Sequence, residues 1–94
     1  MKNIYEVLLA EFSEPINLNT GVRHIPFTIY SEDGKLKVQN SKNNHRLIDR
    51  KQVQNFYDEY KKTGSLSPKN YLDITRHSSY LLAAMHHLKA NGSL

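Results

Sequence analysis

The sequence predicts a small α+β domain in which one helix precedes a β-hairpin and three helices follow it. With 94 residues, the chain has room for a single domain with a modest core. Apolar residues recur at helical spacing in several segments. The dipeptide Asp33-Gly34 lies between two alternating segments and is typical of a two-residue hairpin turn. We therefore expect one domain over residues 1–90 and a disordered tail over residues 91–94.

The first helix is expected over Ile4–Phe12. Asn3 and Glu6 form a capping-box pattern at its start, because the Asn side chain can accept from the free amides of the first turn. Apolar residues then follow at three- and four-residue spacing. The helix ends before Pro15, and residues 14–24 show no strong period, so we interpret them as a loop.

The hairpin is expected to pair Ile25–Tyr30 with Lys35–Gln39. A two-residue turn places Tyr30 opposite Lys37. In that register the apolar side chains share one face: Phe27, Ile29, Leu36 and Val38. Tyr30 lies on the other face, where its ring can stack on a base or pack on Lys37 across the strands. Residues 41–46 are interpreted as a polar, basic loop.

The clearest predicted element is a helix that begins at Asp49. Gln52 follows three residues later as its capping-box partner, and Gly64 is the residue expected just beyond its end. Its apolar stripe consists of Val53, Phe56, Tyr57 and Tyr60. This stripe predicts the side of the helix that faces the core.

Two shorter helices are expected after it. Ser67-Pro68 is typical of a helix start, so the first of them is expected over Pro68–Ile74. Thr75–Ser79 have poor helix propensity and prefer caps and turns, so they are expected to separate the two helices. The last helix is expected over about Ser79–Lys89, with an inward stripe of Leu81, Ala84, Met85 and Leu88. Without the break, a single helix over Pro68–Lys89 would pack across the hairpin.

This C-terminal array resembles the helix-turn-helix of DNA-binding proteins. The resemblance covers about residues 49–89 and rests on the spacing of the helices, with no signature motif. With the hairpin in the place of a wing, the array is winged-helix-like, although the hairpin here precedes the helices. The resemblance implies that the last helix enters the major groove of DNA.

On a helical projection with Leu81 inward, the open face of the last helix carries Arg76, Ser79, Ala83, His86 and Ala90. Small side chains let a helix backbone approach a groove floor closely, and Arg76 can contact phosphate or guanine. Lys69 and Asn70 are expected at the start of the preceding helix, where free amides can hold a phosphate. The predicted nucleic-acid-binding residues are Lys35, Lys37, Lys42, Arg46, Lys69, Asn70, Arg76, His77, Ser79, Tyr80, Ala83 and His86.

The formal net charge of +4 is unevenly distributed along the chain. Residues 1–33 carry two cations and five anions, whereas residues 34–94 carry eleven cations and four anions. This asymmetry indicates that the second part faces a polyanion, although a Lys-rich surface also serves solubility alone. The predicted partner is therefore DNA, in duplex form, bound with marked salt sensitivity.

Catalytic and metal chemistry find little support in the sequence. The chain has no cysteine, which excludes disulfides and cysteine-based zinc sites and fits a reducing, cytoplasmic compartment. His86 and His87 point about 100° apart on a helix, so they do not easily bind one ion together. Ser78 lies beside His77, but no glycine elbow accompanies it. We expect no enzymatic activity, metal, cofactor or membrane span.

Two alternatives remain open. A protein-interaction module, such as a component of a mobile element, a phage or a defence system, can use the same basic face to bind a larger partner. A homodimer can use the last helix, with Tyr80, Leu82 and Met85 at the interface. An exposed Leu82 favours these protein contacts, whereas a hairpin that buries it does not.

Overall fold

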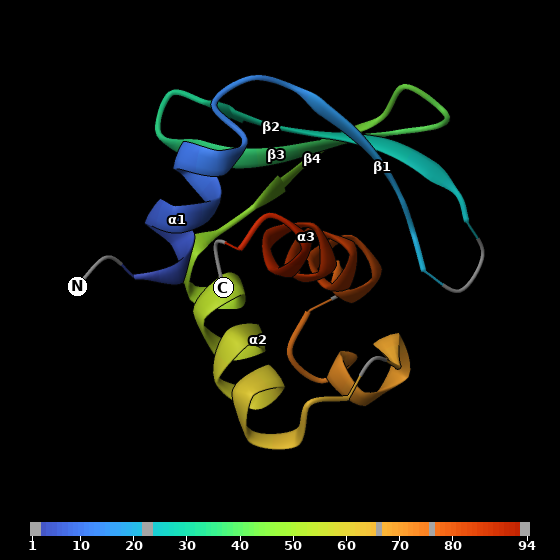
Figure 1. The fold of residues 1–94 in the computed structure, drawn as a ribbon. Coiled ribbons are helices and arrows are strands. Elements are labelled where there is room, and N and C mark those ends of the chain that lie inside the picture. Colours follow the sequence, from blue (N-terminus) through green and yellow to red (C-terminus); the bar gives the residue numbers. More distant parts are fainter. Residues whose placement is uncertain (1–2, 22–23, 66, 76, 93–94) are drawn as a thin grey trace.

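The structure, a computed structural model, describes residues 3–21, 24–65, 67–75 and 77–92. The elements in chain order are α1 (Ile4–Glu11), β1 (Ile16–Asn19), β2 (Pro26–Glu32), β3 (Lys35–Asn40), β4 (His45–Ile48), α2 (Arg50–Thr63), the 3-10 helix η1 (Pro68–Tyr71) and α3 (Ser78–Ala90). Figure 1 shows the sheet along one side of the molecule and the helices together on the other. The predicted α+β class is confirmed.

The four strands form one antiparallel sheet in the order β1-β2-β3-β4. The predicted hairpin is β2–β3, and its register is confirmed: Glu32 pairs with Lys35, Ser31 with Leu36, Tyr30 with Lys37, and Ile29 with Val38. Asp33 and Gly34 both have positive φ, 55° and 74°. A type I′ turn requires this at both central residues, so the Asp-Gly dipeptide explains the register.

The segments before and after the hairpin, both expected as loops, each contain a strand. In β1, Ile16 and Leu18 lie opposite Ile29 and Phe27 of β2, and they extend the apolar face of the sheet. In β4, Ile48 is fully buried. The loop predictions were wrong because a four-residue strand has too little periodicity to identify alone, and these two strands are stabilised by pairing with the hairpin.

The predicted helix ends are confirmed. The Asn3 side chain accepts from the backbone N–H of Glu6 (2.9 Å), and the Asp49 side chain accepts from that of Gln52 (2.7 Å). Gly64 ends α2 in the left-handed conformation, with φ 67°. Because such caps satisfy amides and carbonyls at the helix ends, they fix where α1 and α2 begin and where α2 ends.

The predicted break between two C-terminal helices is also confirmed, although Ser78 and Ser79, which were expected to lie in it, belong to α3. The helix expected over Pro68–Ile74 is a shorter 3-10 helix that ends at Tyr71, and α3 begins at Ser78. The Thr75 hydroxyl accepts from the N–H of His77 (3.0 Å), which is the kind of local turn contact that competes with a helix. A continuous helix over this segment is therefore excluded.

Helix α3 occupies the centre of the fold. The predicted inward stripe is confirmed, since Leu81, Ala84, Met85 and Leu88 are fully buried. Leu82 and Ala83 are also covered, with 9% of each exposed. This happens because α3 contacts the sheet at β1, the 3-10 helix η1 and helix α2 (Figure 1). The order of elements fits the prediction in outline, but the winged-helix arrangement is not confirmed.

The C-terminal end of α3 contacts the end of α1 at Glu11. The His87 ring lies 3.1 Å from the Glu11 carboxylate, and the side-chain amide of Asn91 donates to the same carboxylate (2.8 Å). Asn91 belongs to the segment expected as a disordered tail, of which Ser93 and Leu94 lie outside the described residues. In the part of the chain that the structure describes, no helix is long and apolar enough to cross a membrane.

Candidate functional site

The predicted DNA-contacting face of α3 is largely closed. Ser79 is half-buried, Ala83 is buried, and only His86 and Ala90 of the described residues on that face are exposed. The expectation that Ala83 leaves the backbone open to a groove was wrong. A single inward stripe was assumed, whereas α3 has neighbours on more than one side, so five consecutive residues over Leu81–Met85 are buried. Arg76 lies outside the described residues.

His77 and Tyr80, two further predicted contacts, are half-buried at the start of α3. The Tyr80 ring packs against Phe27 of β2 with 4.8 Å between the ring centres. The His77 ring lies 6.3 Å from the Tyr80 ring in a stacked arrangement. These rings join α3 to the sheet, so the structure gives them a packing role at this position.

Lys69 and Asn70 are exposed on the 3-10 helix η1. The backbone N–H of Asn70 donates to the carbonyl of Ser67 (3.1 Å), and its side-chain amide donates to the Ser65 hydroxyl. The prediction of a phosphate site on free amides was therefore wrong for Asn70. The reason is that a 3-10 turn closes its hydrogen bonds three residues apart and uses this amide itself.

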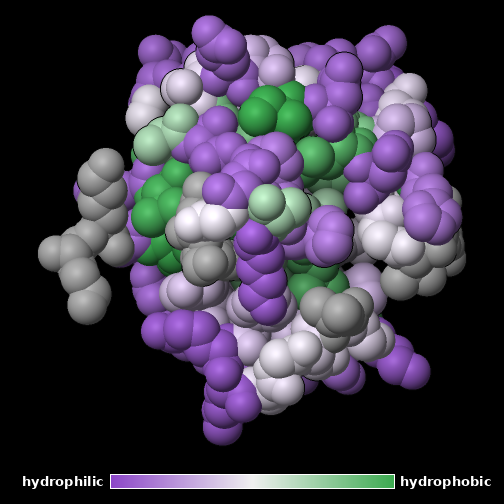
Figure 2. Space-filling model, viewed as in Figure 1, coloured by the Kyte–Doolittle hydropathy of each residue, from purple (hydrophilic) through white to green (hydrophobic). Residues whose placement is uncertain are grey.

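The predicted homodimer interface on α3 is also not available. Leu82 has 9% of its surface exposed and Met85 none, because both belong to the core of the protomer. In the space-filling view, hydrophilic residues cover most of the visible face, and hydrophobic ones show only between them (Figure 2). Contacts through Leu82 and Met85 would require this core to open.

The outer face of the sheet, opposite the helices, carries a polar row that crosses all four strands. Asn17 of β1 pairs with Thr28 of β2, Thr28 with Gln39 of β3, and Gln39 with His45 of β4. Side chains on one face of paired strands lie next to one another, so these four residues form a continuous strip. The helices lie on the opposite face of the sheet (Figure 1).

A second row on the same face contains Tyr30, Lys37 and Leu47, which pair across β2, β3 and β4. The Tyr30 hydroxyl lies 2.8 Å from Nδ1 of His45, and the two rings meet edge to face. The outward position predicted for Tyr30 is confirmed. Tyr30 and His45 therefore form a pair of aromatic rings that lies beside a lysine.

The cations predicted on the hairpin and the loop after it are Lys35, Lys37, Lys42 and Arg46. Lys37 forms an ion pair with Glu32 (2.7 Å), whereas Lys35 at the start of β3 is exposed. Lys42 is exposed in the turn between β3 and β4, and Arg46 is exposed on β4. Lys35 and Lys37 share the strand face of these rows and Lys42 lies in the adjoining turn, whereas Arg46 pairs with the buried Val38 and so belongs to the opposite face of the edge strand β4.

The ion pair with Lys37 lowers the pKa of Glu32, first through the hydrogen bond and then through the positive charge, and the same contact raises the pKa of Lys37. Because folding lowers the pKa of Glu32, the ion pair stabilises the folded state fully at pH values above the ordinary glutamate pKa. This stabilisation is lost as the pH falls through the lowered pKa of the folded state. We expect Lys37→Met to move the NMR titration of the Glu32 carboxyl to higher pH. An unchanged titration would show that the pair does not form in solution.

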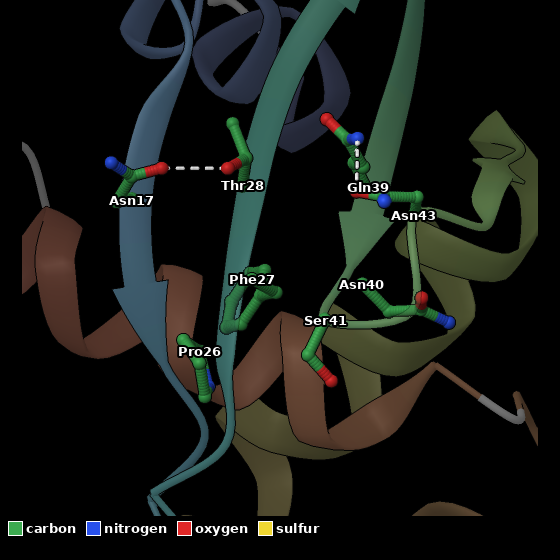
Figure 3. Close-up of a pocket in the computed structure, with 8 residues that line it drawn as sticks. All are labelled: Asn17, Pro26, Phe27, Thr28, Gln39, Asn40, Ser41 and Asn43. Atoms are coloured by element: carbon green, nitrogen blue, oxygen red, sulfur yellow. Dashed lines mark hydrogen bonds between the residues drawn. The ribbon is translucent and has the colours of Figure 1, made fainter.

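The polar row borders a hollow of about 330 Å³ on the outer face of the sheet. Asn17 of β1 lies on one side of it, Gln39 and Asn43 lie on the other, and Thr28 of β2 lies between them (Figure 3). The Thr28 hydroxyl donates to the Asn17 side chain (2.6 Å), and the Gln39 amide donates to the Asn43 side chain (3.2 Å). These hydrogen bonds hold the polar groups in place.

This hollow could not be found from the sequence because three of its lining residues, Asn17, Ser41 and Asn43, lie in segments interpreted as loops. Asn17 belongs to β1, and Asn43 belongs to the turn between β3 and β4. One signal was present: Asn17 and Asn19 alternate with Ile16 and Leu18, as expected for a strand with one solvent-exposed face. That pattern was too short to separate from a loop.

Comparisons with known proteins identify no relative: no family model, curated protein or solved structure matches the chain. Across residues 3–21, 24–65, 67–75 and 77–92, no group of three His, Asp or Glu side chains is placed to hold a metal ion. The candidate site is therefore argued from the geometry of the outer sheet face itself.

Proposed function

We propose that this protein binds nucleic acid through the outer face of its sheet. The observation that carries the proposal is the gathering of aromatic and cationic side chains on a sheet face that no helix covers. Tyr30 of β2 and His45 of β4 supply rings on which bases can stack. Lys37 belongs to β3, the strand between them. Stacking with nearby cations is the usual way in which a protein surface holds nucleotides.

The charge on this side of the molecule favours a polyanion. Three cations, Lys35, Lys37 and Lys42, outnumber the two carboxylates of Glu32 and Asp33 at the hairpin turn. Lys37 and Glu32 are both partly exposed, so Lys37 can exchange its carboxylate partner for a phosphate at small cost. Phosphate contacts of this kind supply affinity that does not depend on sequence.

The sheet is a better candidate than α3, the helix on which the resemblance to helix-turn-helix proteins would place binding. A helix that reads the major groove needs an exposed side whose side chains can reach the base edges. The middle of α3 is covered over Leu81–Met85, so Ser79 and His86 are not joined by an accessible surface along the helix. We therefore propose that nucleic acid contacts the sheet and not α3.

A protein partner is the second candidate, and one observation favours it. Leu47 lies on the edge strand β4, opposite Lys37, and is 49% exposed. An exposed leucine among cations suits an acidic protein surface with an apolar centre. Leu47→Ala would weaken such a contact strongly, whereas it would have little effect on binding to phosphates.

Fluorescence anisotropy with labelled 12-nucleotide single strands and a 12-base-pair duplex, at 50 and 200 mM salt, tests the proposal. The variant Lys35→Ala/Lys37→Ala/Lys42→Ala is expected to bind at least about tenfold more weakly at low salt. Its salt dependence is expected to be less steep by roughly 0.7–0.9 in log–log slope for each phosphate contact removed.

The matched control is Lys51→Ala/Lys61→Ala/Lys62→Ala, which removes three exposed cations from α2 and gives the same net charge. This control is expected to keep the affinity of the wild type within about twofold. Equal losses in the two variants would mean that net charge, and not the sheet face, attracts the nucleic acid. Absence of salt-dependent binding to every probe would overturn the proposal.

A further inference from the structure

We infer that the hollow between Asn17 and Gln39 holds one unpaired base of a single-stranded nucleic acid and gives the protein a base preference. The inference rests on the proposed function and deepens it, because the cations explain attraction to phosphate but do not distinguish bases. The side chains around the hollow are of a different kind. Six of the eight lining residues carry an uncharged amide or hydroxyl, which match the hydrogen-bonding edges of bases: Asn17, Thr28, Gln39, Asn40, Ser41 and Asn43.

The amides keep free hydrogen-bonding capacity in spite of their contacts with one another. Asn17 accepts from Thr28 through its side-chain oxygen, so its NH₂ group remains a donor. Gln39 donates to Asn43 through its nitrogen, so its side-chain oxygen remains an acceptor. Donors and acceptors thus border the same hollow, as recognition of a base edge requires (Figure 3).

The size of the hollow also fits a single base. At about 330 Å³ it lies at the small end of the range of ligand pockets, roughly 300–1,000 Å³. Thr28 and Phe27 of β2 line the hollow between the two amide sides. The Thr28–Asn17 and Gln39–Asn43 hydrogen bonds restrict the rotamers of Asn17 and Gln39. Less side-chain entropy is therefore lost when a base binds.

The neighbouring groups are placed to hold the rest of the strand. Tyr30 lies on the same face as Thr28 and two residues further along β2, a distance of about 7 Å. Its ring can therefore stack on a base next to the one in the hollow. Lys42 precedes Asn43 in the turn at the other side of the hollow, where it can reach a phosphate of the same strand.

A duplex does not fit this surface. The hollow lies on a sheet whose four strands span about 14 Å between the outer backbones, since neighbouring strands are about 4.8 Å apart. The major groove is about 12 Å wide and admits a helix or a two-stranded ribbon. A base can reach the row of Asn17, Thr28 and Gln39 only when it is free of its partner strand.

The test uses anisotropy with labelled 12-mers of adenine, cytosine and thymine deoxynucleotides, their ribonucleotide counterparts with uracil, and a 12-base-pair duplex. For the wild type, we expect one single strand to bind about tenfold more tightly than the weakest, and the duplex to bind more weakly than the preferred strand. A preference in either the DNA or the RNA series supports the inference, and comparison of the series shows whether the 2′-hydroxyl contributes.

The variant Asn17→Ala/Gln39→Ala is expected to bind all single strands equally, at the level of the weakest, with an unchanged salt slope because the phosphate contacts remain. Asn55→Ala, which removes an exposed amide from α2, is the control and is expected to keep the preference. Circular dichroism checks that the variants are folded.

Equal binding of all single strands by the wild type, a preference that survives in the double variant, or a duplex that binds as tightly as the preferred strand would each overturn the base-binding inference alone. In those cases salt-dependent binding remains, and the proposed function stands. Absence of salt-dependent binding to all probes would instead overturn both.

Discussion

Replacing Tyr71 with alanine is expected to lower the free energy of unfolding by about 3–5 kcal/mol, as for other large aromatic side chains removed from a core. Tyr71 is fully buried, and its ring packs on Phe56 of α2 with 4.6 Å between the ring centres. Its hydroxyl donates to the carbonyl of Ser65 (2.6 Å), so the variant also leaves a partly buried carbonyl without this donor. The loss is large for a domain of about 5–15 kcal/mol total stability.

Tyr71 has this effect because η1 has only four residues and cannot hold its own position. The Tyr71 carbonyl accepts from the amides of Ile74 and Thr75, so the same residue also orders the turn that leads to α3. Ser78, at the start of α3, donates through its hydroxyl to the carbonyl of Pro68 (3.1 Å). Loosening η1 therefore loosens the start of the central helix as well.

Urea denaturation followed by circular dichroism measures the change. Tyr71→Phe is a matched variant that keeps the ring and loses only the hydroxyl, and it is expected to cost about 1 kcal/mol. Tyr57→Ala removes a half-buried tyrosine from α2 and is expected to cost clearly less than Tyr71→Ala. A Tyr71→Ala variant within 1 kcal/mol of the wild type would mean that η1 does not dock on α2 through this ring.

The elements that could be predicted from the sequence are those specified by residues close together in the chain. Asp33-Gly34 determines the register of β2–β3 through the dihedral angles of one turn. Asn3 and Asp49 mark helix starts through contacts three residues away, and Gly64 marks a helix end. Such signals can be identified without knowledge of the rest of the fold.

Strands β1 and β4 could not be predicted in this way because their stability comes from distant residues. Ile16 and Leu18 are only two apolar positions, and they are identified as strand positions by the partners Ile29 and Phe27. The polar row from Asn17 to His45 has the same origin, since it exists only when three separate pairings are in register. Only the middle pairing had a local signal.

The misassigned face of α3 has a different cause. The helical projection assumed one buried side, but Leu81–Met85 is a run of five apolar residues, and a helix that is apolar all round is typical of a fully buried element. The sequence therefore contained the signal that Leu82 and Ala83 are covered. The expectation of an open DNA-contacting face on α3 did not take this apolar run into account.

Replacing Tyr5 with phenylalanine is expected to lower the free energy of unfolding by about 1–3 kcal/mol, although it removes a single oxygen atom. The Tyr5 hydroxyl accepts from the N–H of Leu36 (2.8 Å) and donates to the carbonyl of Ile48 (2.9 Å), and both contacts are buried. These two backbone groups belong to paired positions of β3 and β4. In Tyr5→Phe the Leu36 N–H and the Ile48 carbonyl would both lose this partner while they remain buried. A buried polar group without a partner costs more free energy than its hydrogen bond contributes on balance to stability.

The position of this hydroxyl gives the variant a local signature. Leu36 and Ile48 lie where α1 meets the end of the sheet, and Lys37 and Leu47 follow on the outer face at the next paired position. Amide hydrogen exchange at Leu36 is therefore expected to accelerate in Tyr5→Phe by more than the global destabilisation explains. Tyr57→Phe, on the partly exposed side of α2, serves as the control and is expected to stay within about 0.5 kcal/mol of the wild type. If Leu36 exchange and stability are both unchanged in Tyr5→Phe, α1 is not joined to β3 and β4 through this hydroxyl.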